Sequence, residues 1–233
     1  MRIAKYISHS GYCSRRNAEK LILANKVKIN SKICDTLSTK IAKSDTVKID
    51  NKIINLNKLI RIWCFYKPLG IINTSKDTHN RKTIFDLLPK KLKNLISVGR
   101  LDINSEGLLL LTNNGELSRY FELPKNSFRR QYRVRVQGIV DKNKLSILKK
   151  GIKIKNFSYK PIIADLEKQS NTNAWIKMTI TEGKNREIRK ICSHFGWRVN
   201  RLIRIKYGEF SIGNLKPGEI KEIKKHTYIN FNA

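Results

Sequence analysis

Acidic residues are scarce in this chain: 18 Asp and Glu stand against 49 Lys and Arg, which gives a formal net charge of +31 over 233 residues. A surface with this excess attracts polyanions, so nucleic acid or an anionic membrane is the expected partner. A small neutral substrate gives no reason for such a charge. An alternative source for part of the lysine excess is the coding composition, because Asn and Ile are abundant as well.

Long hydrophobic runs and clustered metal ligands are also missing. No apolar stretch approaches the roughly 20 residues that a membrane-spanning helix needs, so we predict a soluble, cytoplasmic protein without a membrane partner. The cysteines form no CxxC pair and the four histidines do not cluster, which disfavours a zinc site or a disulfide framework. There is no GxGxxG or Walker loop, and we predict neither a metal nor a small-molecule cofactor.

The first 60 residues predict a small basic αβ module. Residues 3–24 form two short helices with a break at Gly11, and Ser14 is placed to cap the second. Short alternating segments follow, and residues 1–60 hold 13 Lys or Arg against 4 Asp or Glu. Three cations of the second helix project away from its apolar stripe: Arg15, Arg16 and Lys20.

This module resembles the alpha-L RNA-binding module that certain ribosomal proteins share with RNA-modifying enzymes. The matching stretch is RIAKYISHSGYCSRRNAEKLILANKVKIN, with its helix-turn-helix and the V-x-I-N strand that follows. The resemblance implies that the cationic face of the second helix contacts RNA.

Residues 61–233 predict a second, larger domain. Residues 108–111 form a short apolar segment bounded by turn residues, and residues 132–138 alternate apolar and basic side chains, as strands do. Helical segments are interspersed irregularly among many adjacent strands. We therefore predict an α+β fold with a mixed, largely antiparallel sheet, and not a doubly wound fold.

The segment NREIRKICSHFG predicts a helix with a cationic start. Asn185 is its expected cap, and Arg186 and Lys190 point away from the apolar stripe while Arg189 lies at its border. Cations in the first turn are unfavourable unless an anion neutralises them, and free N–H groups there suit a phosphate or a carboxylate. Arg186 and Lys190 are equally well explained as solvated side chains. For Arg189 we predict a buried acidic partner. The apolar stripe consists of Ile188, Ile191, Cys192 and Phe195.

Asp102 is the acid best placed to be that partner. It follows Gly99-Arg100-Leu101 in a loop between two short apolar strands, and loops on a rigid sheet often carry catalytic groups. The alternative is a turn-forming aspartate whose side chain bonds its own backbone. Periodicity does not decide between the two.

A second resemblance decides between these two roles of Asp102. The string GRLDINSEGLLLLTNNGEL is similar to the signature of one family of RNA pseudouridine synthases, which includes enzymes for small-subunit and for large-subunit ribosomal RNA. KPLG, the tyrosine of RRQYRVRVQG, EGKNREIRK, and RLIRIKYGEF with LKPGE follow in that family's order, and the resemblance runs from residue 1 to about residue 222. Ser105 stands where threonine is commoner, which retains the hydroxyl. The family's reaction is the isomerisation of uridine to pseudouridine in RNA without a metal or organic cofactor.

The resemblance also implies roles for individual residues. Asp102 is the nucleophile at the sugar, Arg189 pairs with it, and Tyr132 is the active-site tyrosine, on which an extruded base can stack. A core-filling strand residue is the alternative for Tyr132. Further cations are assigned to RNA phosphate or loop positioning: Lys67 at the Lys-Pro-x-Gly turn, Arg100, Arg129, Arg130 and Arg186.

Two interpretations of function compete. A chain of this type can be an enzyme or a non-catalytic ribosomal RNA-binding assembly factor, and the presence of Asp102, Tyr132 and Arg189 favours the enzyme. Residues 132–154 and 174–190 resemble the enzymes of this family for large-subunit RNA more closely than those for small-subunit RNA. We therefore predict a monomeric enzyme that acts on large-subunit ribosomal RNA, with small-subunit RNA as the alternative.

Overall fold

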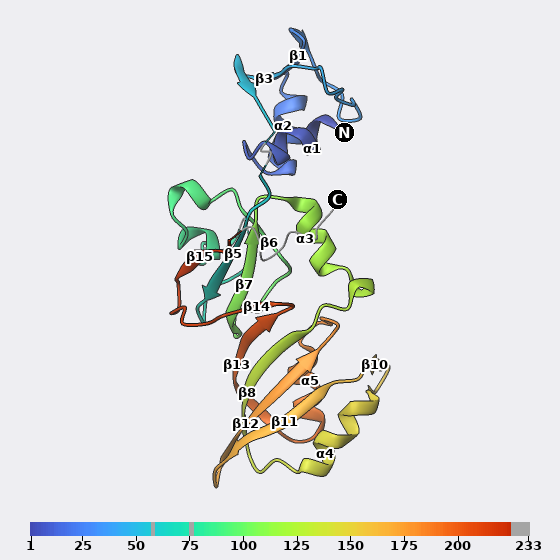
Figure 1. Ribbon diagram of the computed structural model, residues 1–233, viewed down its shortest axis with the longest axis vertical. Helices are drawn as coiled ribbons and strands as arrows, with labels where there is room; N and C mark the ends of the chain where they lie inside the picture. Colours follow the sequence, from blue (N-terminus) through green and yellow to red (C-terminus); the bar gives the residue numbers. More distant parts are fainter. Residues whose placement is uncertain (57–58, 75–76, 225–233) are drawn as a thin grey trace. The chain divides into compact units, whose positions relative to one another are not determined.

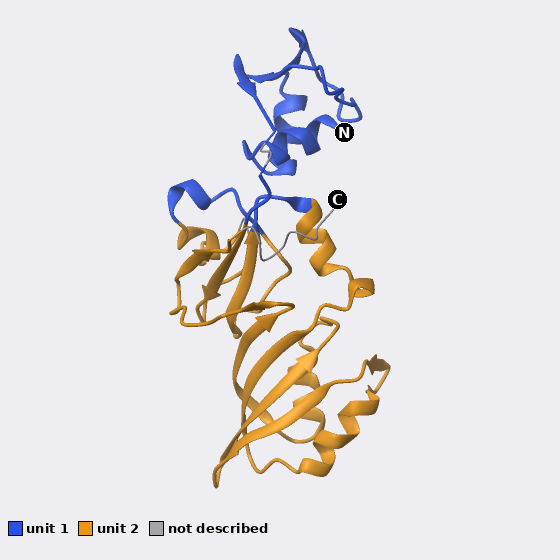
Figure 2. Ribbon diagram, in the orientation of Figure 1, with its two compact units in different colours: residues 1–61, 89–96, 112–115 blue, residues 62–88, 97–111, 116–233 orange. Residues whose placement is uncertain are grey.

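The computed structural model describes residues 1–56, 59–74 and 77–224 (Figure 1). The chain divides into two compact units, the first made of residues 1–61, 89–96 and 112–115 and the second of the remainder (Figure 2). The module predicted over residues 1–60 belongs to the first unit, and its residues 57–58 lie outside the described residues, as do residues 225–233 of the predicted larger domain. The sequence gives no sign that two later segments return to the first unit.

The first unit begins with the two predicted helices, α1 (Ile3–His9) and α2 (Arg15–Leu23). Ser14 caps α2 as predicted, because its hydroxyl accepts the N–H of Asn17 at 3.3 Å. A four-stranded sheet follows in the order β2-β1-β3-β4, and its neighbouring strands pair antiparallel. Its strands are β1 (Val27–Ile29), β2 (Lys32–Ile33), β3 (Val47–Ile49) and β4 (Lys52–Ile54).

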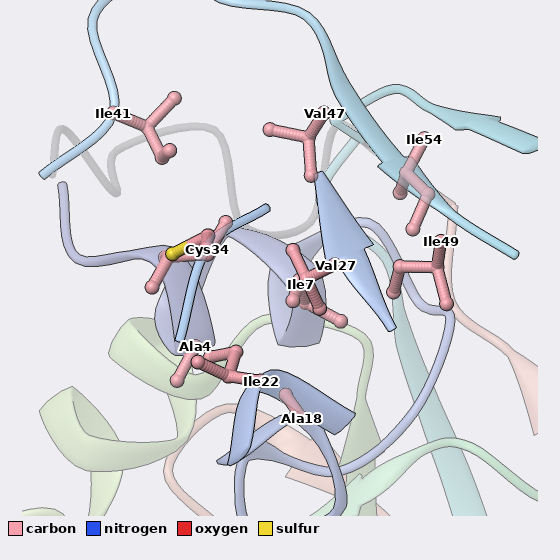
Figure 3. Close-up of a cluster of buried hydrophobic side chains, with 11 residues drawn as sticks. Ala4, Ile7, Ala18, Ile22, Val27, Cys34, Ile41, Val47, Ile49 and Ile54 are labelled. Atoms are coloured by element: carbon pink, nitrogen blue, oxygen red, sulfur yellow. The ribbon is translucent and has the colours of Figure 1, made fainter. Parts of the chain in front are cut away.

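Helices and sheet of the first unit share a small aliphatic core. Ile7 of α1, Ile22 of α2 and Val27 of β1 are fully buried in it (Figure 3). Arg15, Arg16 and Lys20 of α2 are exposed. The apolar stripe of α2 therefore faces the core, and its cations face solvent.

The second unit is built on a mixed sheet in the order β11-β12-β8-β13-β7-β5-β15. The pairs β11/β12, β12/β8, β8/β13 and β5/β15 are antiparallel, whereas β13 and β7 are parallel. The predicted α+β class with a largely antiparallel sheet is confirmed. The strands are β5 (Ile62–Lys67), β7 (Glu106–Thr112), β8 (Arg130–Gln137), β11 (Ile163–Gln169), β12 (Asn173–Ile180), β13 (Arg198–Tyr207) and β15 (Ile220–Glu222), with β6 (Ile96–Ser97) beside β7 and β14 (Phe210–Ser211) beside β13.

Short helices connect these strands. The α-helices are α3 (Gly115–Glu122), α4 (Lys142–Ile147) and α5 (Glu187–His194), and the 3₁₀ turns are η1 (Ile84–Asp86), η3 (Pro124–Asn126) and η4 (Leu148–Lys150). A further 3₁₀ turn, η2 (Lys90–Leu92), lies in the segment of residues 89–96 that belongs to the first unit. A hairpin of β9 (Ile152–Ile154) and β10 (Phe157–Tyr159) completes the unit. Within the described residues, no helix has both the length and the apolar content to cross a membrane.

Strand β8 has two chemically different sides. Tyr132, Val134 and Val136 are buried, whereas Arg133 and Arg135 between them are exposed. The period of two predicted from the sequence is confirmed, since successive strand residues point to opposite faces of the sheet. One side of β8 therefore faces the interior and the other carries cations.

The parallel pair of β7 and β13 depends on a glycine. Gly107 has a φ of +103°, and a Cβ at this position would lie 2.4 Å from the main-chain oxygen of Arg204 and 2.8 Å from its nitrogen. Gly107 is directly opposite Arg204 in the ladder. Only a residue without a side chain permits this close approach.

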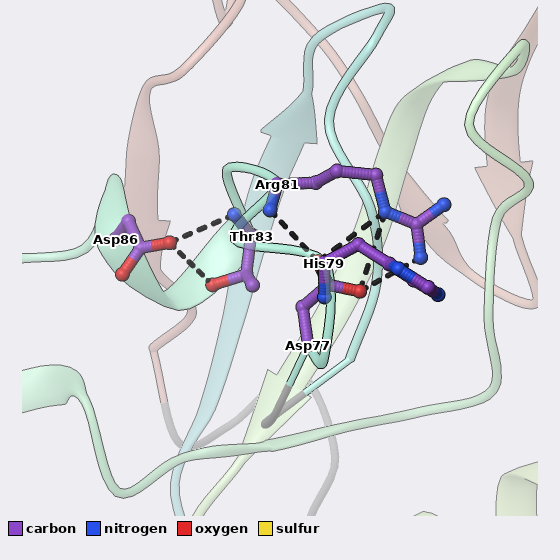
Figure 4. Close-up of polar contacts among 5 residues, drawn as sticks. All are labelled: Asp77, His79, Arg81, Thr83 and Asp86. Atoms are coloured by element: carbon purple, nitrogen blue, oxygen red, sulfur yellow. Dashed lines mark hydrogen bonds and ion pairs between the residues drawn. The ribbon is translucent and has the colours of Figure 1, made fainter.

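The connection after β5 is held by two carboxylates (Figure 4). Asp77 accepts the main-chain N–H groups of His79 and Arg81 and also the Arg81 guanidinium, whose Nη2 lies 2.7 Å from Asp77 Oδ1. These bonds, that of the guanidinium first, lower the pKa of Asp77 below its usual range. Asp86 accepts both the N–H and the hydroxyl of Thr83 at 2.8 Å, which starts the η1 turn.

Candidate active site

A cavity of about 370 Å³ in the second unit contains the three predicted catalytic residues. Asp102 reaches it from the loop before β7, Tyr132 from β8 and Arg189 from α5. The segment between β12 and α5, residues 182–186, forms part of its wall, and β13 contributes Leu202 and Arg204. Residues that are far apart in the sequence are therefore brought to one concave site.

The loop that carries Asp102 is fixed by its own main chain. The N–H of Ser105 donates to the carbonyl oxygen of Asp102 at 3.0 Å and closes a turn. Three successive carbonyl oxygens of this loop accept bonds from other elements: that of Ile103 from the N–H of Gly70 at 3.0 Å, that of Asn104 from Arg189 Nη2, and that of Ser105 from Lys67 Nζ at 2.8 Å. A rigid loop of this kind holds a reactive side chain in place without contacting its reactive atoms.

The Asp102 carboxylate itself is exposed. Within the described residues it forms no hydrogen bond and no ion pair, so the alternative of a side chain bonded to its own turn does not hold. Asp102 shapes the turn through its carbonyl oxygen only. Its carboxylate oxygens remain available to a molecule in the cavity.

The predicted direct ion pair between Arg189 and Asp102 is wrong. Arg189 is half-buried, and its guanidinium donates to the carbonyl oxygens of Asn104 and Val199, the latter at 3.1 Å. Asp102 still acts on it through space: burial and the charge of Arg186 lower the pKa of Arg189, and the charge of Asp102 opposes them. The geometric reason is that two main-chain oxygens take up Nη1 and Nη2 of Arg189, while its buried Nε has no hydrogen-bond partner.

Lys67 is assigned from the sequence to RNA phosphate or loop positioning, and its burial disagrees with the first of these roles. Its side chain is fully buried, and Nζ donates to the carbonyl oxygens of Ser105 and Pro68 at 2.8 and 3.0 Å. Burial lowers the pKa of Lys67 to about 8, against the opposing charges of Asp102 and Glu106. Lys67 is therefore a cation beneath the Asp102 loop, and its buried amine holds that loop.

The two predicted cations Arg129 and Arg130 have different environments. Arg129 is exposed and does not line the cavity, whereas Arg130 is buried, lines it and donates from Nη2 to the Tyr207 hydroxyl at 2.8 Å. Tyr132 is two residues further on the same side of β8 and is 7% exposed. Tyr132 is thus buried as the core alternative predicts, and it also lines the cavity.

The start of α5 differs from the expected one. The residue at the cap position is Arg186, with a left-handed φ of +51°, and not Asn185; no side chain caps the helix. Glu187 in the first turn accepts the N–H of Lys184 at 3.0 Å and orders this end instead. A left-handed conformation is costly for a residue with a Cβ, and such residues concentrate at functional sites. Arg186 and Arg100 are exposed at the cavity wall.

Sequence reasoning assigns no site role to several residues of the cavity, among them Glu182, Glu187, Arg204 and Tyr207. Arg204 is 2% exposed; its Nε donates to the carbonyl oxygen of Leu108 at 2.7 Å, and its Nη2 has no hydrogen-bond partner. Its guanidinium carbon lies 5.2 Å from the centre of the Tyr207 ring. The available signal was the alternation of β13, which places Arg204 on the same side as Leu202.

The charge of the cavity favours an anionic ligand. Six cationic side chains line it against four acidic ones. In the ranges 1–56, 59–74 and 77–224, no three His, Cys, Asp or Glu side chains are grouped so as to hold a metal ion. The acidic members are Asp102, Glu122, Glu182 and Glu187, and the cationic ones are Arg100, Arg130, Lys184, Arg186, Arg189 and Arg204.

Glu187 gives a test of this electrostatic environment. Burial raises its pKa from the ordinary 4.5 to about 7, while the N–H of Lys184 lowers it. Above pH 4.5 the unfolded state loses this proton and the folded state keeps it, so stability falls as the pH rises towards 7. We expect Glu187→Gln to leave stability unchanged at pH 4.5 and to raise it by about 2 kcal/mol at pH 8, measured by urea unfolding. An equal effect of the substitution at both pH values would contradict the raised pKa.

Two family models together match most of the chain. Residues 61–194 match a family model described as RNA pseudouridylate synthase, and residues 1–47 match the S4 domain. The chain is 48% identical over 225 residues to a Rickettsia felis protein named as an uncharacterized RNA pseudouridine synthase, covering 95% of this chain and 96% of that protein. A Bacillus subtilis protein named ribosomal large subunit pseudouridine synthase B is 33% identical and covers 97% of this chain and 93% of its own length.

A Buchnera aphidicola protein of the same name, from the Schizaphis graminum symbiont, is 40% identical and covers 94% of this chain and 88% of its own. Among solved structures, a crystal structure described as a pseudouridylate synthase superposes with a TM-score of 0.68 at 27% identity. It covers 97% of both chains. The similarity therefore includes both units of the chain.

Proposed function

Because this chain belongs to the RNA pseudouridylate synthase family, we propose that its cavity converts a uridine of large-subunit ribosomal RNA to pseudouridine, with Asp102 as the nucleophile. Family membership makes the chain an RNA-modifying isomerase. The single observation that supports the residue assignment is the Asp102 carboxylate, which is free of protein partners on a rigid loop in a cationic cavity. We propose no metal or organic cofactor for this reaction.

The proposed chemistry uses the carboxylate twice. Asp102 attacks or otherwise assists at the ribose while the bond from the sugar to N1 of the uracil breaks, and it departs when carbon 5 of the turned base bonds to the sugar. Carbon 5 then loses its hydrogen as a proton to solvent and N1 takes up a proton, so the product is an isomer of the substrate. A carboxylate suits this role because it is ionised, nucleophilic and able to leave again. Arg189 and Lys67 act as positioning residues, since both donate to carbonyl oxygens of the loop that carries Asp102.

Tyr132 is proposed to receive the extruded base. A uridine in a stem or stacked loop must leave its stack before the sugar is reached, at a cost of a few kcal/mol. Stacking on an aromatic ring returns about 1–3 kcal/mol. Tyr132 lines the cavity on the same side of β8 as Arg130, so its ring is part of the wall that a flipped base meets.

RNA outside the cavity is proposed to contact exposed cations of both units. In this proposal, residues 1–60 form an RNA-binding module and residues 61–233 the catalytic domain. Arg100 and Arg186 at the cavity wall meet phosphates of the target strand, and Arg129 contacts RNA outside the cavity. On the module, the contact surface is the exposed face of α2 with Arg15, Arg16 and Lys20.

The choice of large-subunit RNA rests on the relatives named for that substrate in Buchnera and Bacillus. We expect release of tritium from carbon 5 of labelled uridine when the protein meets a large-subunit transcript, and none with a small-subunit transcript. Mapping pseudouridines in ribosomal RNA from cells with and without the protein identifies the position. Tritium release only from the small-subunit transcript would make small-subunit RNA the substrate. Tritium release from neither transcript would favour a non-catalytic assembly factor.

A further inference from the structure

We propose that the sheet face opposite the cavity binds a second segment of the substrate RNA, in contact with cations and one tryptophan. The identity of the RNA rests on the proposed function. We call this surface the outer face and define it by five side chains of adjacent strands: Arg133 and Arg135 of β8, Trp175 and Lys177 of β12, and Arg201 of β13.

Strand register places these side chains on one side of the sheet. Arg135 is directly opposite Trp175 on β12 and opposite Arg201 on β13, and Arg133 is opposite Lys177. Paired residues of neighbouring strands point to the same face. Arg130 and Tyr132, on the other side of β8, line the cavity, so the outer face is a different surface from the site already described.

Like charges meet across the strands of the outer face. Arg135 lies directly opposite Arg201, and Arg133 lies directly opposite Lys177. Like charges in directly opposite positions destabilise a sheet. These two pairs therefore destabilise the sheet by charge repulsion, and a bound polyanion would reduce that repulsion.

The protein neutralises one member of each pair and leaves the other. Arg133 Nε lies 2.7 Å from Glu167, and Arg201 Nε lies 2.6 Å from Glu106. Within the described residues, Arg135 and Lys177 form neither an ion pair nor a side-chain hydrogen bond. Asp165 of β11 is directly opposite Lys177 on this face, without an ion pair between them. Strands β8 and β12 thus each keep one cation outside an ion pair, and the cations of the outer face outnumber the carboxylates beside it: Arg133, Arg135, Lys177 and Arg201 against Asp165, Glu167 and Glu106.

An aromatic side chain lies among these cations. Trp175 is half-buried, and the Arg133 guanidinium lies 4.8 Å from the centre of its ring. The other two tryptophans, Trp63 and Trp197, are buried at 4% and 5% exposure. Bases stack on aromatic rings and on arginine guanidinium planes, and phosphates pair with free cations. Free cations, an arginine plane and a half-exposed ring together favour RNA over a lipid surface.

The test is a charge-matched binding comparison. We expect Arg135→Gln/Lys177→Gln to weaken binding to a full large-subunit ribosomal RNA transcript roughly tenfold or more at 0.1 M salt. The slope of log Kd against log salt should flatten by roughly 1.4–1.8, since each lost phosphate contact removes about 0.7–0.9. The control Lys144→Gln/Lys149→Gln removes the same charge from exposed positions of α4 and η4.

Two outcomes overturn this inference. One is an affinity and slope of the outer-face variant equal to those of the α4 control. The other concerns tryptophan fluorescence, which we expect the transcript to quench in the wild-type protein and to quench far less in Trp175→Phe. Equal quenching of the two proteins would overturn the inference. Binding is measured without turnover, so a chain that binds through the outer face but forms no pseudouridine would refute the proposed function alone.

Discussion

Asp102→Asn is expected to lower pseudouridine formation by roughly 10⁴-fold or more, because an amide is neither a nucleophile nor a leaving group for this reaction. The substitution keeps the volume of the side chain. It also keeps the carbonyl oxygen that accepts the Ser105 N–H, and the carboxylate it removes has no protein partner. The fold and the affinity for RNA should therefore be retained. The measurement is tritium release from carbon 5 of labelled uridine under single-turnover conditions.

The control for this experiment is Glu209→Gln, which makes the same chemical change at an exposed position of the second unit. It is expected to retain the wild-type rate. Equal release by wild type and Asp102→Asn would refute the catalytic role of Asp102. Loss of activity together with loss of the urea unfolding transition would instead assign Asp102 a structural role, against the free carboxylate described above.

Gly107→Ala is expected to destabilise the second unit by about 4 kcal/mol. The added Cβ meets main-chain atoms of Arg204 at 2.4 and 2.8 Å, and a φ of +103° is itself unfavourable for a residue with a side chain. Relief requires β7 and β13 to separate. That movement displaces Arg204 and the loop leading from Asp102 into β7, so activity should fall with stability. Urea unfolding and single-turnover rates measure the two effects.

Gly138→Ala is the matched control for the backbone effect. Gly138 has nearly the same dihedral angle, a φ of +105°, and no atom within 4 Å of an added Cβ. Its substitution should cost only the conformational penalty, about 1–2 kcal/mol. Similar losses for the two variants would show that the contact between β7 and β13 is not as close as described.

The predictions from sequence succeed where a pattern is local. The Ser14 cap, the apolar stripe of α5 and the alternation of β8 are each confirmed, because spacing along one element decides which face is buried. The same reasoning placed Arg189 at the border of its helix, and it does reach the cavity. Asp102 and Tyr132 came from the resemblance of the motifs and not from periodicity.

The ion pair predicted for Arg189 and the phosphate contact considered for Lys67 fail for one reason, which is contact with the main chain. Both side chains donate to carbonyl oxygens of the Asp102 loop, and every residue carries such an oxygen, so no sequence pattern marks the acceptor. The start of α5 was also predicted wrongly. Asn185 is the better cap by residue type, but the cap position is occupied by Arg186 in a left-handed conformation.

The sequence alone determined the charge of this protein, its local elements and the residue types available for chemistry, because these properties depend on composition and on neighbours along the chain. The tertiary structure decided which side chains meet. Gly107 and Arg204 pair across 97 positions, and Arg135 and Arg201 share one face of the sheet. Contacts of this kind depend on strand order and register, which are fixed only when the whole sheet has formed.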